Sequence, residues 1–170
     1  MLSTLTPMKK FLLLYGVYIL ALFILIEQSY FKSLLNINGY FSEFVTAISA
    51  NVMMLFTTVS YENHFIHLSN GSLEVLFGCN GLESIILYIA AILAYPASKQ
   101  AKVYGFIIGF VVINIINIFR IVTLGYVHLY YQSIFSVMHD YITQNIMIVL
   151  VFVVFVVYLN WIGDDAEETA

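Results

Sequence analysis

The chain has 170 residues, of which 62% are hydrophobic and only 9% are charged. A soluble domain normally carries about 25% charged residues, so this composition excludes an ordinary water-soluble globule and indicates a polytopic helical membrane protein. The net charge is −4 and only six side chains are basic, which is too few for a surface that follows nucleic-acid phosphates. The apolar runs are long and unbroken, whereas a β-barrel would show alternating segments of about ten residues.

The first apolar run follows Lys9 and Lys10 and predicts a transmembrane helix over residues 11–27. A secretory signal peptide has the same basic start, but no small-x-small cleavage pattern follows, so we interpret the segment as an uncleaved span. Residues 40–59 place apolar side chains at helical spacing, with serine, glutamate, threonine and asparagine between them. This mixture predicts an interfacial or re-entrant helix in preference to a lipid-exposed span.

A polar, turn-rich segment comes next and predicts a β-hairpin over residues 63–77. Two short apolar stretches flank Asn70 and Gly71, a pair that favours a two-residue turn because both residues tolerate positive φ. The hairpin leads directly to Cys79, which is the only cysteine in the chain and therefore forms no internal disulfide.

Three further apolar runs predict transmembrane spans over residues 79–95, 103–127 and 139–161. The loop between the first two contains Lys99 and Lys102 and no acidic residue. Because basic loops stay in the cytoplasm, this loop and the N-terminal lysines are expected on the same, inner side of the membrane. Four crossings satisfy both conditions and leave both termini in the cytoplasm, whereas five crossings would put one lysine pair on the wrong side.

The whole chain, residues 1–170, is expected to form one integral membrane domain, because it contains no internal repeat, low-complexity tract or linker. We predict an all-α membrane protein with about four transmembrane helices, one interfacial or re-entrant helix and a short extracytoplasmic β-hairpin. The lipid bilayer is the expected partner of the whole protein. The acidic tail supplies much of the negative charge through Asp164, Asp165, Glu167 and Glu168.

Three isolated polar groups stand near the outer ends of these spans, namely Cys79, Arg120 and His139. At 1.5 Å per residue, Cys79 is expected about 24 Å and Arg120 about 27 Å above the inner loop. His139 is expected about 33 Å above Trp161, a plausible aromatic anchor at the inner interface. Because the hydrocarbon core is about 30 Å thick, the three side chains are expected at one level near the outer surface, where they would form an active site.

Cys79 is expected to open a helix, with Gly78 before it and Gly81 shortly after it. A helix N-terminus offers free N–H groups and positive potential, which favour thiolate over thiol. The N–H groups of Asn80 and Gly81 would then receive the oxyanion of a tetrahedral intermediate. A cysteine in a membrane protein can equally be a small hydrophobic residue without chemistry, so its surroundings decide between the two interpretations.

Arg120 is the only arginine, and an unpaired guanidinium at membrane depth costs at least about 2.5 kcal/mol. We therefore predict a partner, and Glu83, one turn after Cys79, is the candidate. The pair is either a purely structural clamp between two helices or a clamp that also directs Arg120 at the thiolate. Asn114 and Asn117 precede Arg120 on roughly the same helix face, which indicates a polar cavity on that side.

His139 begins the last predicted span, and beside a cysteine it would serve as general base and then as acid for the leaving amine. Asp140 is adjacent in sequence but is expected on a different helix face, so we do not include it in a triad. A zinc site built from Cys79 and histidines lacks metal-ligand spacing, and we expect neither a metal nor a cofactor. The remaining histidines are interpreted as interfacial polar residues: His64, His67 and His128.

The motifs Cys79-Asn80-Gly81-Leu82 and Asn117-Ile118-Phe119-Arg120, followed by His139, occur at the ends of successive spans. With this order and placement, the chain resembles the exosortase/archaeosortase family of membrane-embedded cysteine transpeptidases over residues 65–162. The resemblance implies that Cys79 is the nucleophile and that Arg120 and His139 complete the catalytic set. Two features differ from the family pattern: Asn80 replaces the more usual serine or alanine, and the chain has about four spans where larger members have eight.

The resemblance also implies a substrate class, namely exported proteins with a C-terminal tail made of a short motif, one transmembrane helix and a basic cluster. Such tails are cut near the motif, outside the membrane, through a thioester acyl-enzyme that water, an amine or a glycan acceptor resolves. The implied location is the bacterial cytoplasmic (inner) membrane, with the active site facing the periplasm. A substrate helix would lie alongside the last three spans and present its motif near Cys79.

Two other classes of function are compatible with the composition. In a non-catalytic membrane assembly or scaffold protein, a pair between Arg120 and Glu83 would be a structural lock. A small transporter is disfavoured, because the polar groups gather near one face of the membrane and not at mid-depth. Dependence of the function on Cys79 distinguishes the enzyme from the scaffold.

Overall fold

The computed structural model describes residues 6–28 and 36–168, and within them the chain is mostly helical with one small sheet. The long helices are α1 (Pro7–Glu27), α3 (Ile37–Met54), α4 (Leu82–Ala94), α5 (Lys99–Tyr130) and α7 (Gln144–Glu168). The strands are β1 (Ser60–Glu62), β2 (Phe65–Leu68) and β3 (Gly71–Glu74). Three short helical segments link α5 to α7: the 3-10 helix η2 (Gln132–Ile134), α6 (Phe135–Val137) and the π-helix η3 (Met138–Thr143).

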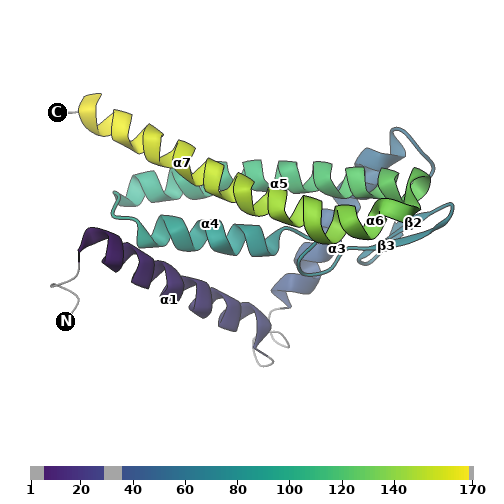
Figure 1. The fold of residues 1–170 in the computed structure, drawn as a ribbon, viewed down its shortest axis with the longest axis horizontal. Helices are drawn as coiled ribbons and strands as arrows, with labels where there is room; N and C mark the ends of the chain where they lie inside the picture. Colours follow the sequence, from purple (N-terminus) through teal and green to yellow (C-terminus); the bar gives the residue numbers. More distant parts are fainter. Residues whose placement is uncertain (1–5, 29–35, 169–170) are drawn as a thin grey trace.

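Helices α1, α4, α5 and α7 run along the long axis of the molecule, whereas α3 and the sheet lie together at one end (Figure 1). The first residues of α1 and α5 and the last residues of α7 lie at the opposite end. The lysines at the starts of α1 and α5 therefore share one end of the molecule. This arrangement agrees with the expectation that both lysine pairs lie on the same side of a membrane.

Three helical stretches of the described chain are long and apolar enough to cross a membrane: Pro7–Ile26, Lys99–Tyr130 and Gln132–Gly163. The span predicted at residues 79–95 is shorter, because α4 has only 13 residues and a length of about 20 Å. A multi-pass membrane protein is thus confirmed, but a count of four full-length spans is not. The helix ends at Ala94 because Tyr95 precedes Pro96 and adopts an extended conformation with ψ 135°.

The predicted helix at residues 40–59 forms as α3 and is not among the helices long and apolar enough to span a membrane. Its buried face combines apolar with small polar side chains: Ser42, Val45, Thr46, Ser49, Ala50 and Met53. This face packs against α5 and the sheet. Its position in the membrane interface stays a prediction.

The hairpin predicted at residues 63–77 is part of a three-stranded antiparallel sheet in the order β1-β2-β3. The additional strand pairs Ser60 with His67 and Glu62 with Phe65, so a second two-residue loop precedes β2. Asn63 in this loop has φ 52°, a left-handed conformation that asparagine tolerates better than most residues. We did not predict β1, because three residues are too few to show a strand periodicity.

The loop between β2 and β3 lies one residue earlier than the Asn-Gly signal suggests. Leu68 pairs with Gly71, so the loop consists of the two residues between them and Gly71 belongs to the strand. The Asn70 side chain instead donates to the carbonyl oxygens of His128 (2.9 Å) and Leu129 (3.3 Å) at the end of α5. This tertiary contact explains the shift, because it requires Asn70 at the tip of the loop.

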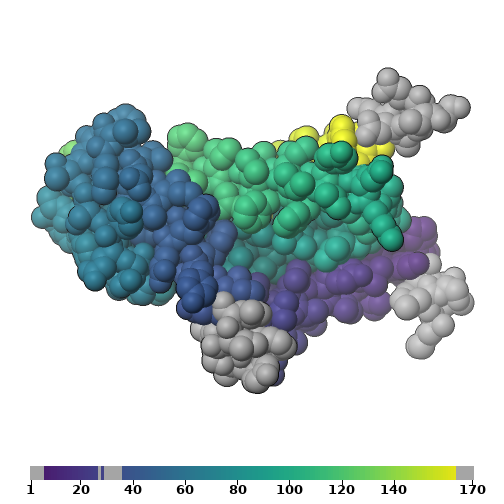
Figure 2. All heavy atoms as spheres, turned by 180° about the vertical axis from the view of Figure 1, so that it is seen from behind, coloured from purple at the N-terminus to yellow at the C-terminus, as the bar shows by residue number. Residues whose placement is uncertain are grey.

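Buried side chains form two apolar clusters that meet along α5. One joins α3, the sheet, Cys79 and the end of α5, and the other joins α4, α7 and the middle of α5. In Figure 2, which views the molecule from behind, the sheet and α3 (blue) lie together at the left end, and α5 (green) and α4 (teal) extend to the right from them. Large apolar side chains on the outer faces of α1, α5 and α7 are exposed, as expected for lipid contact: Val17, Leu20, Ile24, Ile107, Val111, Ile115, Val149, Phe152 and Val157.

Candidate active site

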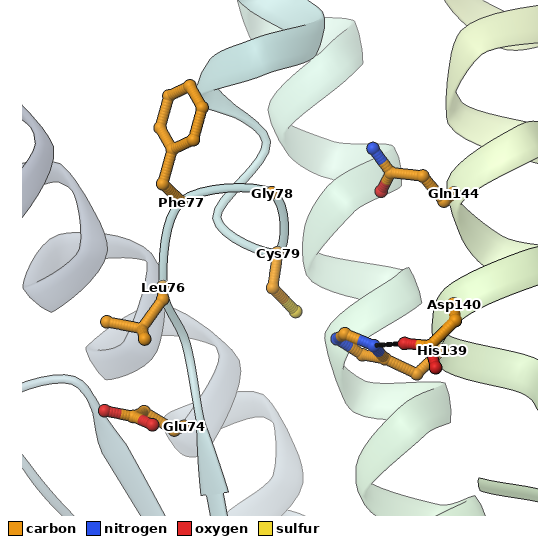
Figure 3. A pocket seen from close by; sticks show the side chains of 8 residues that line it. All are labelled: Glu74, Leu76, Phe77, Gly78, Cys79, His139, Asp140 and Gln144. Atoms are coloured by element: carbon orange, nitrogen blue, oxygen red, sulfur yellow. Dashed lines mark hydrogen bonds and ion pairs between the residues drawn. The ribbon is translucent and has the colours of Figure 1, made fainter. Parts of the chain in front are cut away.

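A cavity of about 480 Å³ opens between the segment that follows β3 and the helical segment that contains η3 and the start of α7. Cys79, His139 and Gln144 line it, together with the carboxyl groups of Glu74 and Asp140. In Figure 3 the Cys79 side chain points across the cavity toward the imidazole ring of His139. Two side chains that are separated by 60 positions in the sequence therefore meet, as the helical rise predicted.

Cys79 lies in a tight turn and not in the first turn of a helix, because α4 begins only at Leu82. The N–H groups of Cys79 and Asn80 both donate to the carbonyl oxygen of Leu76, at 2.9 and 2.8 Å. The Asn80 N–H is thus engaged and does not offer the free oxyanion donor that we predicted. The corresponding role of the Gly81 N–H stays a prediction.

Two glycines give this turn its shape. Gly78 has φ 89° and Gly81 has φ 86°, conformations that side chains with a Cβ rarely adopt. A Cβ on Gly81 would also lie 2.8 Å from the Cγ of Asn117, so α4 and α5 approach each other closely here. The spacing of Gly78 and Gly81 around Cys79 therefore has a local reason: it turns the chain back on itself and leaves the Cys79 side chain directed into the cavity.

Asn80 fixes the turn to its surroundings through a fully buried side chain. Its Nδ2 donates to Asn38 Oδ1 (2.7 Å) and Ser42 Oγ (2.8 Å), both on α3. Its Oδ1 accepts from the N–H of Leu82 at 3.0 Å, which satisfies one of the free donors at the start of α4. Asparagine at this position is therefore a structural link between the cysteine turn, α3 and α4.

Asn80→Ala is expected to destabilise the protein by about 2–4 kcal/mol, because it leaves three buried or half-buried polar groups without their partner. The measurement is unfolding in mixed micelles titrated with denaturing detergent. Asn114→Ala is the matched control: Asn114 donates only to a carbonyl of its own helix, at 2.8 Å, and its loss should cost less than about 1 kcal/mol. Equal losses in the two variants would contradict the linking role of Asn80.

Arg120 is 8% exposed and lies directly behind the cysteine turn. Its two terminal nitrogens donate to the carbonyl oxygen of Gly78 at 3.2 and 3.3 Å, and its Nε donates to Thr143 Oγ1 at 3.1 Å. A third direction is occupied by Gln144, whose Oε1 accepts at 3.1 Å. The guanidinium is thus held on three sides and sits against the backbone carbonyl that precedes Cys79.

The predicted direct pair between Arg120 and Glu83 is not formed. Gln144 stands between them, because its Nε2 donates to Glu83 Oε2 at 3.0 Å while its Oε1 faces Arg120. Asn117 is buried and accepts a long contact of 3.4 Å from Arg120, whereas Asn114 bonds to its own helix and lies outside this network. The polar face predicted on α5 is therefore real at Asn117 and Arg120 only.

The helix that carries His139 begins earlier than predicted, since helical structure already starts at Gln132 and is π-helical through Met138–Thr143. We expected Asp140 on a different helix face from His139 and therefore left it out of a triad, but the two side chains do meet: His139 Nδ1 lies 2.7 Å from Asp140 Oδ1. Both residues line the cavity, and their side chains bend toward each other. Adjacent residues of a helix point in different directions, but these side chains are long enough to meet. π-helical turns are frequent at functional sites, so the irregularity itself marks this segment.

Sequence reasoning missed three polar residues of this site, namely Asp140, Thr143 and Gln144. Thr143 accepts from Arg120 and donates to the carbonyl oxygen of His139 at 3.2 Å, so it joins the guanidinium to the backbone of the π-helix. A signal was present, because these residues follow His139 within five positions of an otherwise apolar span. Polar side chains clustered inside such a span usually face the protein interior and have partners there.

Comparisons with known proteins identify the family of this chain. The family model described as transmembrane exosortase matches residues 4–162. The curated "Probable archaeosortase E" of Methanocaldococcus jannaschii is 32% identical over 158 residues, which cover 92% of this chain and 82% of that protein. No solved structure matches significantly. The resemblance seen in the cysteine, arginine and histidine motifs is thereby confirmed, and the chain belongs to the exosortase/archaeosortase family.

Proposed function

We propose that this protein is a membrane-embedded cysteine peptidase or transpeptidase that cleaves the C-terminal sorting tails of exported proteins. The observation that carries the proposal is that Cys79 and His139 line one cavity while Arg120 is bonded to the carbonyl immediately before the cysteine. Membership of a family of sorting enzymes supports the same activity. The alternative of a scaffold protein depended on a direct Arg120–Glu83 lock, which Gln144 interrupts.

His139 is the proposed base in the first step. The Asp140 carboxylate accepts from the Nδ1–H of the ring, so the Nε2 lone pair is free to take a proton. In Figure 3 the second ring nitrogen lies on the side of Cys79. The thiol proton passes to Nε2, and the sulfur attacks the carbonyl carbon of the scissile peptide and forms a C–S bond. Arg120, which bonds to the carbonyl oxygen of Gly78 next to the cysteine, would stabilise the negative charge that develops in this step.

The tetrahedral intermediate then collapses to a thioester. The C–N bond breaks, and the leaving amine takes the proton from His139 Nε2. The acceptor is water, an amine or a glycan hydroxyl. It gives a proton to His139 Nε2 and attacks the thioester carbonyl carbon. The C–S bond breaks, and the Cys79 sulfur recovers the proton from His139. Each turnover therefore returns the enzyme to its starting protonation state.

The proposed orientation has the lysine-bearing ends of α1 and α5 in the cytoplasm of a bacterial cell. Strand β3 and helix α6, which adjoin the segments that line the cavity, lie at the opposite end of the molecule (Figure 1). The cavity would therefore open toward the periplasm. A substrate tail would lie alongside α4, α5 and α7 with its own basic cluster at the cytoplasmic side. The recognised motif would then enter the cavity from the outer surface.

The experiment that tests the proposal is trapping of the acyl-enzyme. The protein is co-expressed with a protein of the same genome that ends in a short motif, one apolar helix and a basic cluster. We expect a covalent adduct between the enzyme and the N-terminal part of the substrate that neutral hydroxylamine releases, because a thioester is cleaved by this nucleophile. Cys79 is the only cysteine, so the adduct has one possible site.

Detection is by mass spectrometry of the purified membrane protein before and after hydroxylamine treatment. The control is the same substrate with its motif deleted, which should give no adduct. A tail that is cut without any hydroxylamine-sensitive adduct, in samples quenched over the full time course, would count against covalent catalysis by Cys79.

A further inference from the structure

Gln144 is a polar residue of the cavity to which the proposed chemistry assigns no task. It is half-buried, lines the same cavity as Cys79 and His139, and bonds at once to a cation and an anion. Arg120 donates to its Oε1 at 3.1 Å, and its Nε2 donates to Glu83 at 3.0 Å. A neutral side chain with two charged neighbours of opposite sign requires an explanation beyond packing.

The orientation of the Gln144 amide is fixed by its neighbours. A guanidinium can only donate and an ionised carboxylate can only accept, so the amide oxygen must face Arg120 and the amide nitrogen must face Glu83. Both ends of the side chain are therefore engaged. Gln144 is thus a rigid spacer and not a mobile cavity side chain.

The spacer changes where the Arg120 charge acts. Arginine and glutamate in contact form a two-fold hydrogen-bonded pair in which the two charges largely cancel. Gln144 carries no net charge, so it satisfies hydrogen bonds of both ions without bringing them into contact. The guanidinium keeps its remaining donors on the carbonyl of Gly78, next to Cys79. In a site of low dielectric, the separation of charges by one side chain has a large effect.

We propose that Gln144 is a positioning residue: a neutral spacer that keeps Arg120 apart from Glu83 and so directs the guanidinium charge at the Cys79 sulfur. This inference deepens the proposed function and rests on it. Thr143, the preceding residue, holds the opposite edge of the guanidinium through Nε. Thr143 ends η3 and Gln144 begins α7, so the residues that position Arg120 lie within five positions of His139, which η3 carries.

A charge swap tests the inference. The double variant Glu83→Gln/Gln144→Glu keeps one carboxylate, one amide and both hydrogen bonds, but it moves the carboxylate into contact with Arg120. The other titratable groups around the cavity are unchanged by the swap: Glu74 on β3, and His139 and Asp140 on η3. An unchanged thiol in this variant contradicts the spacer role. A less reactive thiol agrees with it, and an uncharged substitution at position 144 then separates loss of the spacer from direct repulsion between the new carboxylate and the Cys79 sulfur.

The readout is the pH dependence of alkylation of Cys79 by iodoacetamide, with the full chain in detergent micelles. Since the chain has a single cysteine, every labelled protein reports this site. We expect the pH of half-maximal alkylation rate to rise by about one unit in the swap, which makes labelling about tenfold slower at neutral pH. Gln100→Glu, at the far end of α5, is the control for a charge change distant from the cavity and should label like the wild type.

A second variant covers the case in which the swap does not fold. Gln144→Ala removes both hydrogen bonds and vacates the space between Arg120 and Glu83 without adding a charge, so it should shift the alkylation profile in the same direction. A wild-type profile in either variant, once gel filtration shows it to be monodisperse, overturns the inference. Alkylation needs no substrate tail, so the result is independent of whether the wild type forms the acyl-enzyme. Failure of tail cleavage would overturn the proposed function and leave the measurement on Gln144 standing.

Discussion

Cys79→Ala is expected to abolish cleavage of a co-expressed tail while the protein remains folded. In the proposed mechanism the sulfur forms the only covalent bond to the substrate, so no other group of the cavity would replace it. The side chain is 4% exposed and belongs to the apolar cluster at the sheet end of α5, and the loss of one sulfur atom there should cost about 1 kcal/mol. Cleavage is followed by the electrophoretic mobility of the tail protein, and folding by gel filtration in detergent.

Two further variants sharpen this experiment. Cys79→Ser keeps the size of the side chain but replaces a good nucleophile with a hydroxyl group, so it should also fail to cleave. His67→Gln removes an exposed histidine of β2 that does not line the cavity, and it should cleave at the wild-type rate. Residual cleavage in the alanine variant, in cells without another sorting enzyme, would show that Cys79 is not the nucleophile.

Arg120→Lys is expected to lower the cleavage rate by about 10²–10³-fold, although it preserves the positive charge. A lysine has one ammonium group and cannot reach the carbonyl of Gly78, Thr143 and Gln144 in three directions at once. The charge would therefore move away from the cysteine turn, and the partners that remain would be buried without a donor. The rate is measured from the time course of tail cleavage in purified proteoliposomes.

The same substitution should reduce stability by about 2–4 kcal/mol, measured by detergent-titrated unfolding. Lys102→Arg is the matched control, because Lys102 is a half-buried residue at the distant end of the same helix, and it donates only to the Leu93 carbonyl, at 2.8 Å. It should change neither the rate nor the stability. A lysine at position 120 that supports near wild-type cleavage would mean that only the charge matters and that the planar fork is dispensable.

The rise of a helix per residue is a fixed quantity, so residue counts along separate spans predict that Cys79, Arg120 and His139 lie close together. In the structure, Cys79 and His139 line one cavity and Arg120 bonds to the carbonyl before the cysteine. The helical character of the spans and the turn-rich segment before Cys79 follow just as directly from composition. These features depend on local chemistry and on bilayer thickness, and neither of these requires knowledge of how the helices pack.

Other features depend on contacts that no local pattern encodes. The late start of α4 is set by positive φ angles at Gly78 and Gly81 and by the close approach of Asn117. The space between Arg120 and Glu83 is set by how the helices pack, and an amide fits there where opposite charges alone suggested a direct pair. The π-helix at Met138–Thr143 was not predicted, because the sequence pattern was compared only with the α-helical period of 3.6 residues.

The shortness of α4 has a consequence for the path of water. A helix of about 20 Å is shorter than a hydrocarbon core of about 30 Å, and α4 is enclosed by α1, α5 and α7, so lipid does not surround it. In the proposed orientation, the cysteine turn before α4 would therefore lie below the outer membrane surface, inside a wall of longer helices. Water or another polar acceptor would then reach a thioester at Cys79 through the cavity between β3 and η3, and the depth of that cavity would limit how large an acceptor can be.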